Sequence, residues 1–121
     1  MPKGAICHIE FHTTDLQATK AFYERIFAWT VEIFPGFETY GMFRTPDGFG
    51  GGFDAGPNAD PPSDKGAVVH IEVDDIDTTL KLIEDRGGKM LAPKTKISDE
   101  FGYYATFLDN VGNRVALWSK T

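Results

Sequence analysis

Two short segments of the chain each place a histidine and a glutamate two positions apart. The first pair is His8 and Glu10, and the second is His70 and Glu72, which follows after 70 − 8 = 62 residues. Imidazole nitrogens bind divalent cations, and carboxylates serve as metal ligands or as general acids and bases. The pattern therefore predicts a site of metal-assisted or acid–base chemistry, and its recurrence predicts one structural module used twice.

Each pair lies in an apolar strand pattern that leads to an acidic helix start. Alternate residues of a strand point to opposite faces, so residues 5–12 are expected to have one core face and one polar face. The expected core face holds Cys7, Ile9 and Phe11, and the polar face holds Ile6, His8, Glu10 and His12. A thiol on the core face would be a poor nucleophile.

The rest of the first half predicts a helix and three further strands. A capping box at residues 14–17, in which the Thr14 hydroxyl accepts a free amide, starts a helix that runs to about residue 29. The expected strands are 30–34, 38–45 and 49–54. The last of them contains Gly50, Gly51 and Gly52, which indicate that another group approaches the backbone closely.

The second half repeats this order after a linker rich in proline and glycine. The expected elements are a strand at 67–73, a helix from about 74 to 86, a short strand at 89–92, a polar segment at 93–102 and a hairpin at 103–120. A chain of 121 residues is too short for two independent cores. We therefore expect a single domain with module 1 at about 1–55, a linker at about 56–65 and module 2 at about 66–121.

Composition excludes several classes of partner. The formal net charge is −6 and no run of lysine and arginine occurs, which argues against binding of nucleic acid or of an anionic membrane. Cys7 is the one cysteine, so it cannot form an internal disulfide. Without a signal peptide or a long apolar run in the sequence, a cytoplasmic protein is the expectation.

Several motifs in this order resemble the vicinal oxygen chelate superfamily, which includes glyoxalases, bleomycin-resistance proteins and extradiol dioxygenases. The resemblance covers the whole chain and is strongest to the short branch related to lactoylglutathione lyase. It implies an α+β fold in which two βαβββ modules form a curved eight-stranded mixed sheet around a cleft. The motifs are His8 with Asp15-Leu16, Ala21-Phe22-Tyr23, Phe27-Ala28-Trp29, residues 70–76, Gly87-Gly88-Lys89, Phe107-Leu108-Asp109, Gly112-Asn113 and Leu117-Trp118.

The resemblance also implies where a metal ion would bind. His8 and His70 match the first-strand ligand positions of metal-using members. The last-strand positions fall on Ala116 and on Gly51 or Gly52, which offer no ligand atom, so the ligand set for Zn, Ni, Mn or Fe is incomplete. Glu10, Glu72 or Asp54 would have to complete it.

Further residues of the same strands are candidates for ligand contact. Trp118 and Arg114 are expected on the cleft face with Ala116, where Trp118 would stack on a planar ligand or form part of an interface. Gly51 and Gly52 are candidates because small residues allow close approach. His12 lies on the same strand face as His8 and Glu10. For this residue we favour an ordinary hydrogen-bonded role over a functional one, because His12 ends its strand and has no histidine counterpart in the repeat.

These observations leave two functions open. One is an enzyme of the lyase, isomerase or dioxygenase type that acts on a small oxygenated or carbonyl-containing metabolite, with Glu10 or Glu72 as general base. The other is a metal-free protein that binds a drug or metabolite without catalysis, in which Glu10 and Glu72 are ordinary solvated residues. In both cases the resemblance implies a homodimer with a small-molecule ligand.

Overall fold

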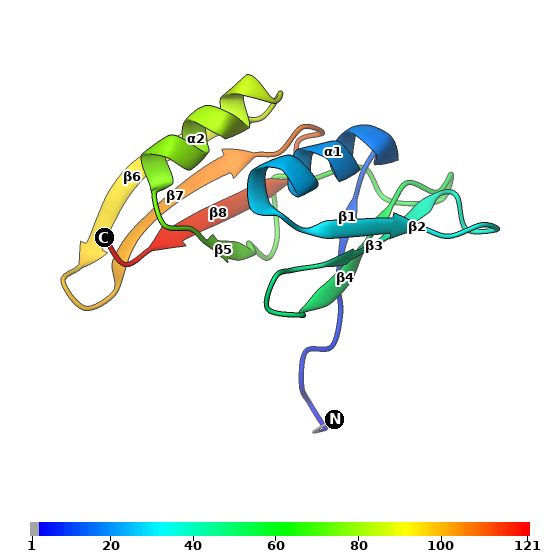
Figure 1. Cartoon of the computed structure of the whole chain (residues 1–121), viewed down its shortest axis with the longest axis horizontal. Helices are drawn as coiled ribbons and strands as arrows, with labels where there is room; N and C mark the ends of the chain where they lie inside the picture. Colours follow the sequence, from blue (N-terminus) through cyan, green and yellow to red (C-terminus); the bar gives the residue numbers. More distant parts are fainter. Residues whose placement is uncertain (1–2) are drawn as a thin grey trace. The chain divides into compact units, whose positions relative to one another are not determined.

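The computed structural model describes residues 3–121 and divides the chain into two compact units, Met1–Pro62 and Ser63–Thr121. Each unit contains a strand, a helix and three further strands in that order, and each has its own four-stranded mixed sheet (Figure 1). The predicted fold class of two βαβββ modules is confirmed, with the eight strands present as two sheets. The predicted single domain and its module bounds stay predictions.

In the first unit, an aromatic core lies between helix α1 and the sheet. Its elements are β1 (Ile9–His12), α1 (Leu16–Phe27), β2 (Thr30–Ile33), β3 (Tyr40–Arg44) and β4 (Gly50–Asp54). The sheet order is β1-β4-β3-β2, with β1 parallel to β4 and the other pairs antiparallel. Tyr23 and Phe53 are fully buried, and their ring centroids are 5.0 Å apart. Phe11 stacks on Phe53 at 5.7 Å, which confirms that this side chain of β1 faces the core.

Helix α1 begins and ends slightly inside the predicted range. Asp15, rather than Thr14, is the N-cap, because its carboxylate accepts a hydrogen bond from the amide of Ala18 at 3.0 Å. Ala28 follows the last helical residue with a left-handed backbone (φ 58°), so the helix stops at Phe27. This turn directs Trp29 back into the core, where it stacks on Phe43 at 4.6 Å.

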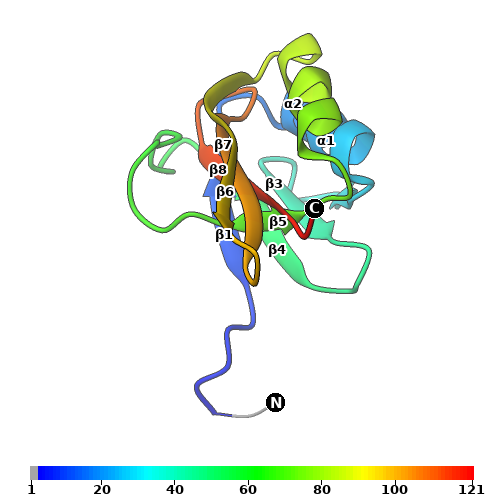
Figure 2. The ribbon, with the colours of Figure 1, turned by 90° about the vertical axis from the view of Figure 1, so that its left-hand side faces the viewer.

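The second unit has the same order of elements. They are β5 (His70–Glu72), α2 (Ile76–Asp85), β6 (Lys89–Ser98), β7 (Gly102–Leu108) and β8 (Arg114–Ser119), with the sheet order β5-β8-β7-β6. Helix α2 packs on β6, β7 and β8 and is followed by Gly87 with φ +96°, as predicted (Figure 2). The core includes the fully buried side chains of Ile76, Ile83, Phe107 and Leu117.

The prediction of a polar segment without a strand at 93–102 is wrong, because strand β6 extends to Ser98. The strand continues through Pro93 to Ser98 and pairs with β7, with register shifts between Met90 and Ala92 and between Ala92 and Thr95. Proline is tolerated here because β6 is an edge strand and the irregular pairing removes the need for an amide donor at that position. The sequence pattern alone did not distinguish an irregular edge strand from a loop.

The close approach predicted at the glycine run is confirmed, and aromatic side chains of β3 make it. A Cβ atom on Gly51 would lie 2.4 Å from the Phe43 ring and 2.2 Å from the Ile9 carbonyl. A Cβ atom on Gly52 would lie 1.9 Å from the Tyr40 hydroxyl. The two glycines therefore make room for one ring on each face of the sheet.

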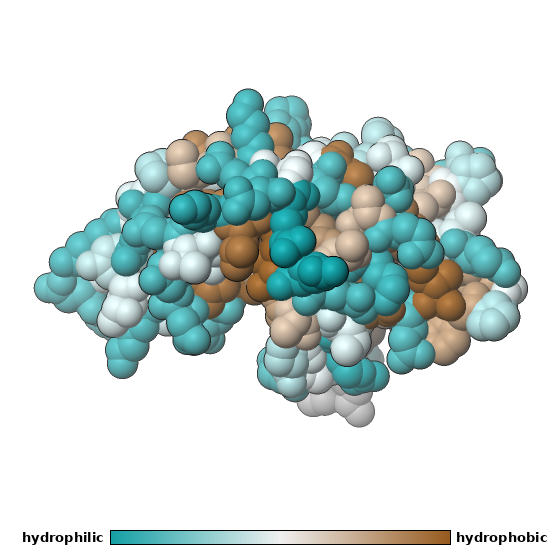
Figure 3. All heavy atoms as spheres, turned by 45° about the horizontal axis from the view of Figure 1, so that its top comes forward, coloured by the Kyte–Doolittle hydropathy of each residue, from teal (hydrophilic) through white to brown (hydrophobic). Residues whose placement is uncertain are grey.

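The surface differs from the prediction at Cys7 and is mostly hydrophilic on the face seen in Figure 3. Cys7 is exposed rather than buried, because it precedes the first residue of β1 and the core contacts begin further along the strand. Hydrophilic residues cover most of the face seen in Figure 3, and apolar residues reach the surface in several places. Within residues 3–121, neither helix is long and apolar enough to cross a membrane.

Candidate functional site

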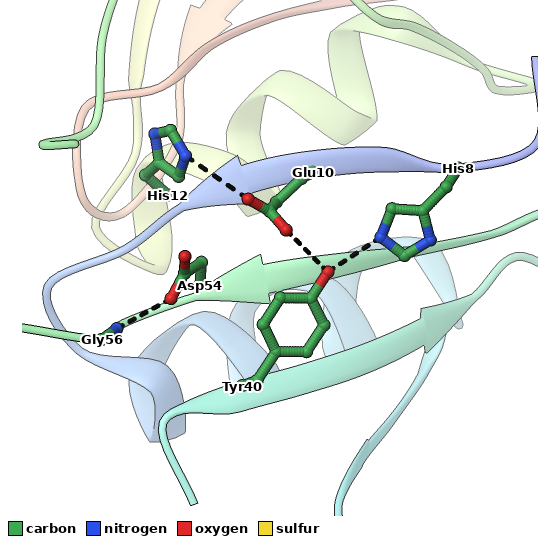
Figure 4. Close-up of polar contacts among 6 residues, drawn as sticks. All are labelled: His8, Glu10, His12, Tyr40, Asp54 and Gly56. Atoms are coloured by element: carbon green, nitrogen blue, oxygen red, sulfur yellow. Dashed lines mark hydrogen bonds and ion pairs between the residues drawn. The ribbon is translucent and has the colours of Figure 1, made fainter. Parts of the chain in front are cut away.

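Strand β1 and the residue before it present three polar side chains along the side of the sheet opposite the aromatic core. These are His8, Glu10 and His12, which alternate with Ile9 and Phe11. The parallel pairing of β1 with β4 sets Glu10 opposite Gly52 and His12 opposite Asp54. Figure 4 shows the Glu10, His12 and Asp54 side chains together on this side of the two strands.

Tyr40 joins two of these residues from the neighbouring strand β3. Its hydroxyl donates a hydrogen bond to Glu10 Oε2 at 2.8 Å and lies 2.8 Å from His8 Nε2 (Figure 4). The His8 and Tyr40 rings are nearly parallel, with centroids 6.4 Å apart. A continuous polar network therefore runs from His8 through Tyr40 to Glu10.

The Tyr40 phenol stays protonated in this environment. Burial, followed by the hydrogen bond to Glu10 and the negative charges of Glu10 and Asp54, raises the pKa of Tyr40 well above its ordinary value of 10.0. The phenol is consequently a hydrogen-bond donor across the physiological pH range. A carboxylate accepts that hydrogen, which leaves the phenol oxygen as the acceptor for His8.

Glu10 also faces a second set of residues with its other carboxylate oxygen. Glu10 Oε1 lies 3.7 Å from His12 Nε2, and one ligand atom each of Glu10, His12 and Asp54 lie within 4.8 Å of one another. Asp54 Oδ1 accepts a hydrogen bond from the amide of Gly56 at 2.9 Å, which orients the carboxylate. His12 and Asp54 are half-buried and Glu10 is exposed, so the group is open to solvent on one side.

The donor set of this group suits a divalent transition metal. One imidazole nitrogen and two carboxylates are ligands that Zn²⁺, Mn²⁺ and Fe²⁺ accept. Two ligand atoms at about 2.1 Å from one ion are about 3.0–3.4 Å apart in octahedral or tetrahedral geometry. The 3.7 Å between Glu10 Oε1 and His12 Nε2 exceeds this range, and all three ligand atoms lie within 4.8 Å, so the side chains would have to move closer together to share one ion.

The sequence-based expectations account for part of this arrangement. Glu10 and Asp54 were among the carboxylates expected to complete a metal site, and the structure brings them together. The sequence pattern favours an ordinary hydrogen-bonded role for His12 and does not predict that it lies beside Glu10 and Asp54. The one signal in the sequence was its position on the same strand face as Glu10, whereas the parallel register that sets it opposite Asp54 appears only in the structure.

The predicted residues of the second unit have different surroundings. His70 and Glu72 are exposed, and His70 Nδ1 lies 3.2 Å from the Val68 carbonyl. The register sets His70 opposite Ala116, which is fully buried, and Glu72 opposite Trp118. Within residues 3–121, His70 and Glu72 belong to no group of three metal-ligating side chains.

Two further candidate ligand-binding residues lie on β8. The half-buried Trp118 donates its indole N–H to the Phe101 carbonyl at 2.7 Å, whereas Arg114 is exposed. Roles in ligand binding for Trp118, Arg114, Gly51 and Gly52 stay predictions, as do a metal role for His8 and His70 and a catalytic role for Glu10 and Glu72.

A sequence model of the glyoxalase/bleomycin resistance protein/dioxygenase superfamily matches residues 5–117. The chain belongs to this superfamily. That match confirms the resemblance seen in the motifs, and it covers both βαβββ units of the superfamily member.

Solved structures of the superfamily share the fold of this member. A glyoxalase/bleomycin resistance protein/dioxygenase family enzyme from Burkholderia phytofirmans PsJN has a TM-score of 0.74 and 15% identity, over 95% of this chain and 98% of that chain. A glyoxalase-related enzyme from Fulvimarina pelagi has a TM-score of 0.72 and 16% identity, over 96% and 88%. At these identities the likeness shows the fold alone.

A third similar structure contains a metal ion. It is a mutant of the fosfomycin resistance protein FosX from Listeria monocytogenes, complexed with Mn(II) and 1S,2S-dihydroxypropylphosphonic acid. Its TM-score is 0.75 at 19% identity, over 98% of this chain and 91% of that chain. No curated protein matches the sequence.

Proposed function

We propose that this superfamily member binds a divalent metal ion through Glu10, His12 and Asp54 and acts on a small oxygenated or carbonyl-containing metabolite. The observation that carries the proposal is the convergence of three ligand atoms, from β1 and β4, within 4.8 Å. Of the four ligand positions implied by the family, only His8 and His70 carry a side chain that can bind a metal ion. We therefore propose the ion at the three converging residues of the first unit instead.

Each of the three residues has a defined part in this proposal. His12 would supply the nitrogen ligand, and Glu10 and Asp54 would supply the oxygen ligands. The amide of Gly56 holds one oxygen of Asp54, so the second oxygen is the one available to an ion. A bound divalent ion would polarise the substrate oxygens and stabilise negative charge that develops on them.

The chain's own residues would orient and discriminate ligands beside that ion. Tyr40 and His8 line the same side of the strands, and Figure 4 shows both rings next to Glu10. Their hydroxyl and imidazole groups favour a substrate rich in oxygen over a purely apolar one. The FosX mutant is complexed with Mn(II) and a dihydroxypropylphosphonic acid, which supports this substrate class by analogy within the fold.

A metal-free binding protein is the second candidate, and Ala116 is the observation that favours it. The residue is fully buried opposite His70, at a position where metal-using members carry a ligand. Trp118, which lies two residues further along β8 opposite Glu72, would then stack on a planar ligand.

Metal content and affinity separate the two functions. Protein purified without an affinity tag would be titrated with MnCl₂ and ZnCl₂ in a calorimeter, as wild type and as His12→Ala, Asp54→Asn and His70→Ala. The proposal predicts one ion per chain at micromolar affinity or better, lost in His12→Ala and Asp54→Asn and retained in His70→Ala. Loss in His70→Ala with retention in His12→Ala would move the ion to the histidines implied by the family, and no binding by wild type would favour the metal-free function.

The homodimer implied by the resemblance is part of the proposal. Light scattering coupled to size exclusion would give about twice the chain mass of 13.4 kDa for a dimer. A mass equal to one chain would contradict it.

A further inference from the structure

We propose that Tyr40 is a positioning residue for the Glu10–His12–Asp54 group, because its hydroxyl fixes the carboxylate of Glu10 in the orientation that the group requires. The inference rests on the proposed function, since it concerns the same site. It assigns a role to a residue that lies outside the group and whose importance the sequence pattern did not indicate.

The two oxygens of Glu10 face different partners. Oε2 accepts the hydrogen bond of the Tyr40 hydroxyl at 2.8 Å, and Oε1 lies 3.7 Å from His12 Nε2. Because Tyr40 holds Oε2, Oε1 is directed toward His12 (Figure 4). Without the phenol, both oxygens of this exposed side chain would be free to rotate toward solvent.

The route by which Tyr40 reaches Glu10 depends on a glycine. Tyr40 pairs with Asp54 across β3 and β4, whereas Glu10 lies opposite Gly52, two residues earlier on β4. The tyrosine side chain therefore leans along the sheet and occupies the space over Gly52, where a Cβ atom would meet the hydroxyl at 1.9 Å and ring carbons at 2.2 and 2.4 Å. Any side chain at position 52 would displace the phenol.

The direction of the hydrogen bond from Tyr40 to Glu10 also fixes the tautomer of His8. The Tyr40 hydrogen points to the Glu10 carboxylate, so the 2.8 Å contact between His8 Nε2 and the phenol oxygen requires a hydrogen on Nε2. Neutral His8 is therefore the Nε2–H tautomer, with Nδ1 left as an acceptor. This assignment gives a spectroscopic signature that depends on the Tyr40 hydroxyl and not on the fold.

Residues that orient a metal ligand have measurable effects on affinity. Loss of such a partner typically weakens metal binding by about 10-fold to 100-fold, because the ligand must be ordered when the ion binds. Tyr40→Phe removes the hydroxyl and retains the ring over Gly52, so it tests the hydrogen bond with little change in packing. Tyr104→Phe, which makes the same chemical change on β7 of the second unit, is the matched control.

The experiment measures Mn²⁺ affinity by calorimetry for wild type, Tyr40→Phe and Tyr104→Phe, with long-range ¹H–¹⁵N spectra of the histidine rings without metal. We expect affinity about 10-fold to 100-fold weaker in Tyr40→Phe and unchanged in Tyr104→Phe. We also expect the His8 ring to be the Nε2–H tautomer in wild type and a mixture of tautomers in Tyr40→Phe. Equal affinity of wild type and Tyr40→Phe would overturn the inference.

A second pair of variants tests the same point without removal of a polar group. Gly52→Ala should displace the phenol and weaken Mn²⁺ binding as Tyr40→Phe does, whereas at Gly50→Ala the nearest atom to the added Cβ is 3.3 Å away and affinity should be retained. Full affinity in Gly52→Ala would also contradict the inference. If wild type binds Mn²⁺ and only His12→Ala and Asp54→Asn lose it, the proposed function stands and this inference fails; if wild type binds no metal, both fail.

Discussion

The phenol of Tyr40 fills the space over Gly52 and donates its hydrogen to Glu10, the residue that lies opposite Gly52 on the neighbouring strand. A glycine on β4 thereby lets a tyrosine on β3 reach a glutamate on β1. This relationship links the glycine run, which weakens β4 as a strand, to the polar group on the same side of the sheet.

The glycine run should show different costs of substitution at neighbouring positions. At Gly51 an added Cβ would meet the Ile9 carbonyl at 2.2 Å, which is backbone and cannot move aside, as well as the buried Phe43 ring. We expect Gly51→Ala to lower the free energy of unfolding by about 2 kcal/mol or more and Gly50→Ala by well under half of that. Urea denaturation measures both, and equal stabilities would contradict the packing described for β4.

Glu24 should stabilise the first unit in a pH-dependent manner. Its carboxylate accepts hydrogen bonds from Lys20 Nζ at 2.8 Å and from the amide of Val31 at 3.0 Å, and it thereby ties α1 to β2. We expect Glu24→Gln to lower the free energy of unfolding at pH 7 by about 1 kcal/mol, since the side chain is half-buried and solvent weakens the ion pair.

The sign of the pH dependence follows from the direction of the shift. The hydrogen bond from Lys20 and then that from Val31 lower the pKa of Glu24 from its ordinary value of 4.5. The stabilisation is therefore present above pH 4.5 and is lost as the pH falls through the lower pKa of the folded state. The difference between wild type and Glu24→Gln in chemical denaturation should shrink on acidification, and a difference that grows would contradict this assignment.

Asn113 should be a structural residue of the second unit. Its side-chain amide donates to Asp109 Oδ2 at 3.1 Å, and its Oδ1 accepts the amide of Ser63 at 3.2 Å, where the linker meets β8. We expect Asn113→Ala to cost about 1–3 kcal/mol of unfolding free energy, because buried polar groups lose their partners. Thermal unfolding would measure this cost, with Asn58→Ala, at an exposed turn residue, as the control that should change little.

A metal ion that binds only the folded protein should raise its thermal stability. At a Mn²⁺ concentration 100 times the dissociation constant, binding adds about 2.7 kcal/mol to the free energy of unfolding. We expect a higher Tm for wild type with Mn²⁺ and no change for Asp54→Asn. An equal rise in both proteins would show that the ion stabilises the fold from somewhere other than the proposed site.

The sequence predicted most elements because local signals and periodicity agreed. Asp75 caps helix α2, and Gly87 follows the helix in the left-handed conformation. Both residue types are helix-boundary signals that the sequence alone provides. The errors arose where a tertiary contact decided the outcome. Pro93 lies inside a strand because β6 is an irregular edge, and Cys7 is exposed because the core contacts of β1 start beyond it.

The candidate site was only partly predictable for a related reason. The face of Glu10 and His12 follows from alternation, but the neighbour of His12 depends on the register between β1 and β4, which no local pattern specifies. The contribution of Tyr40 depends on two registers and on the empty position at Gly52. The repeat indicated His70 and Glu72, whereas the three converging ligands all lie in the first unit. Gly52 lies opposite Glu10 and Trp118 lies opposite Glu72, so Asp54, two residues after Gly52, corresponds to Lys120 of the second unit. A lysine there offers no carboxylate ligand.

The position of a metal ion in crystals grown with MnCl₂, located by anomalous diffraction, tests the proposed metal site directly. We expect one anomalous peak at about 2.0–2.2 Å from a ligand atom of each of Glu10, His12 and Asp54, with the Tyr40 hydroxyl still bonded to the second oxygen of Glu10. A peak bound instead by His8 or His70, or no peak at the three residues at saturating Mn²⁺, would contradict it.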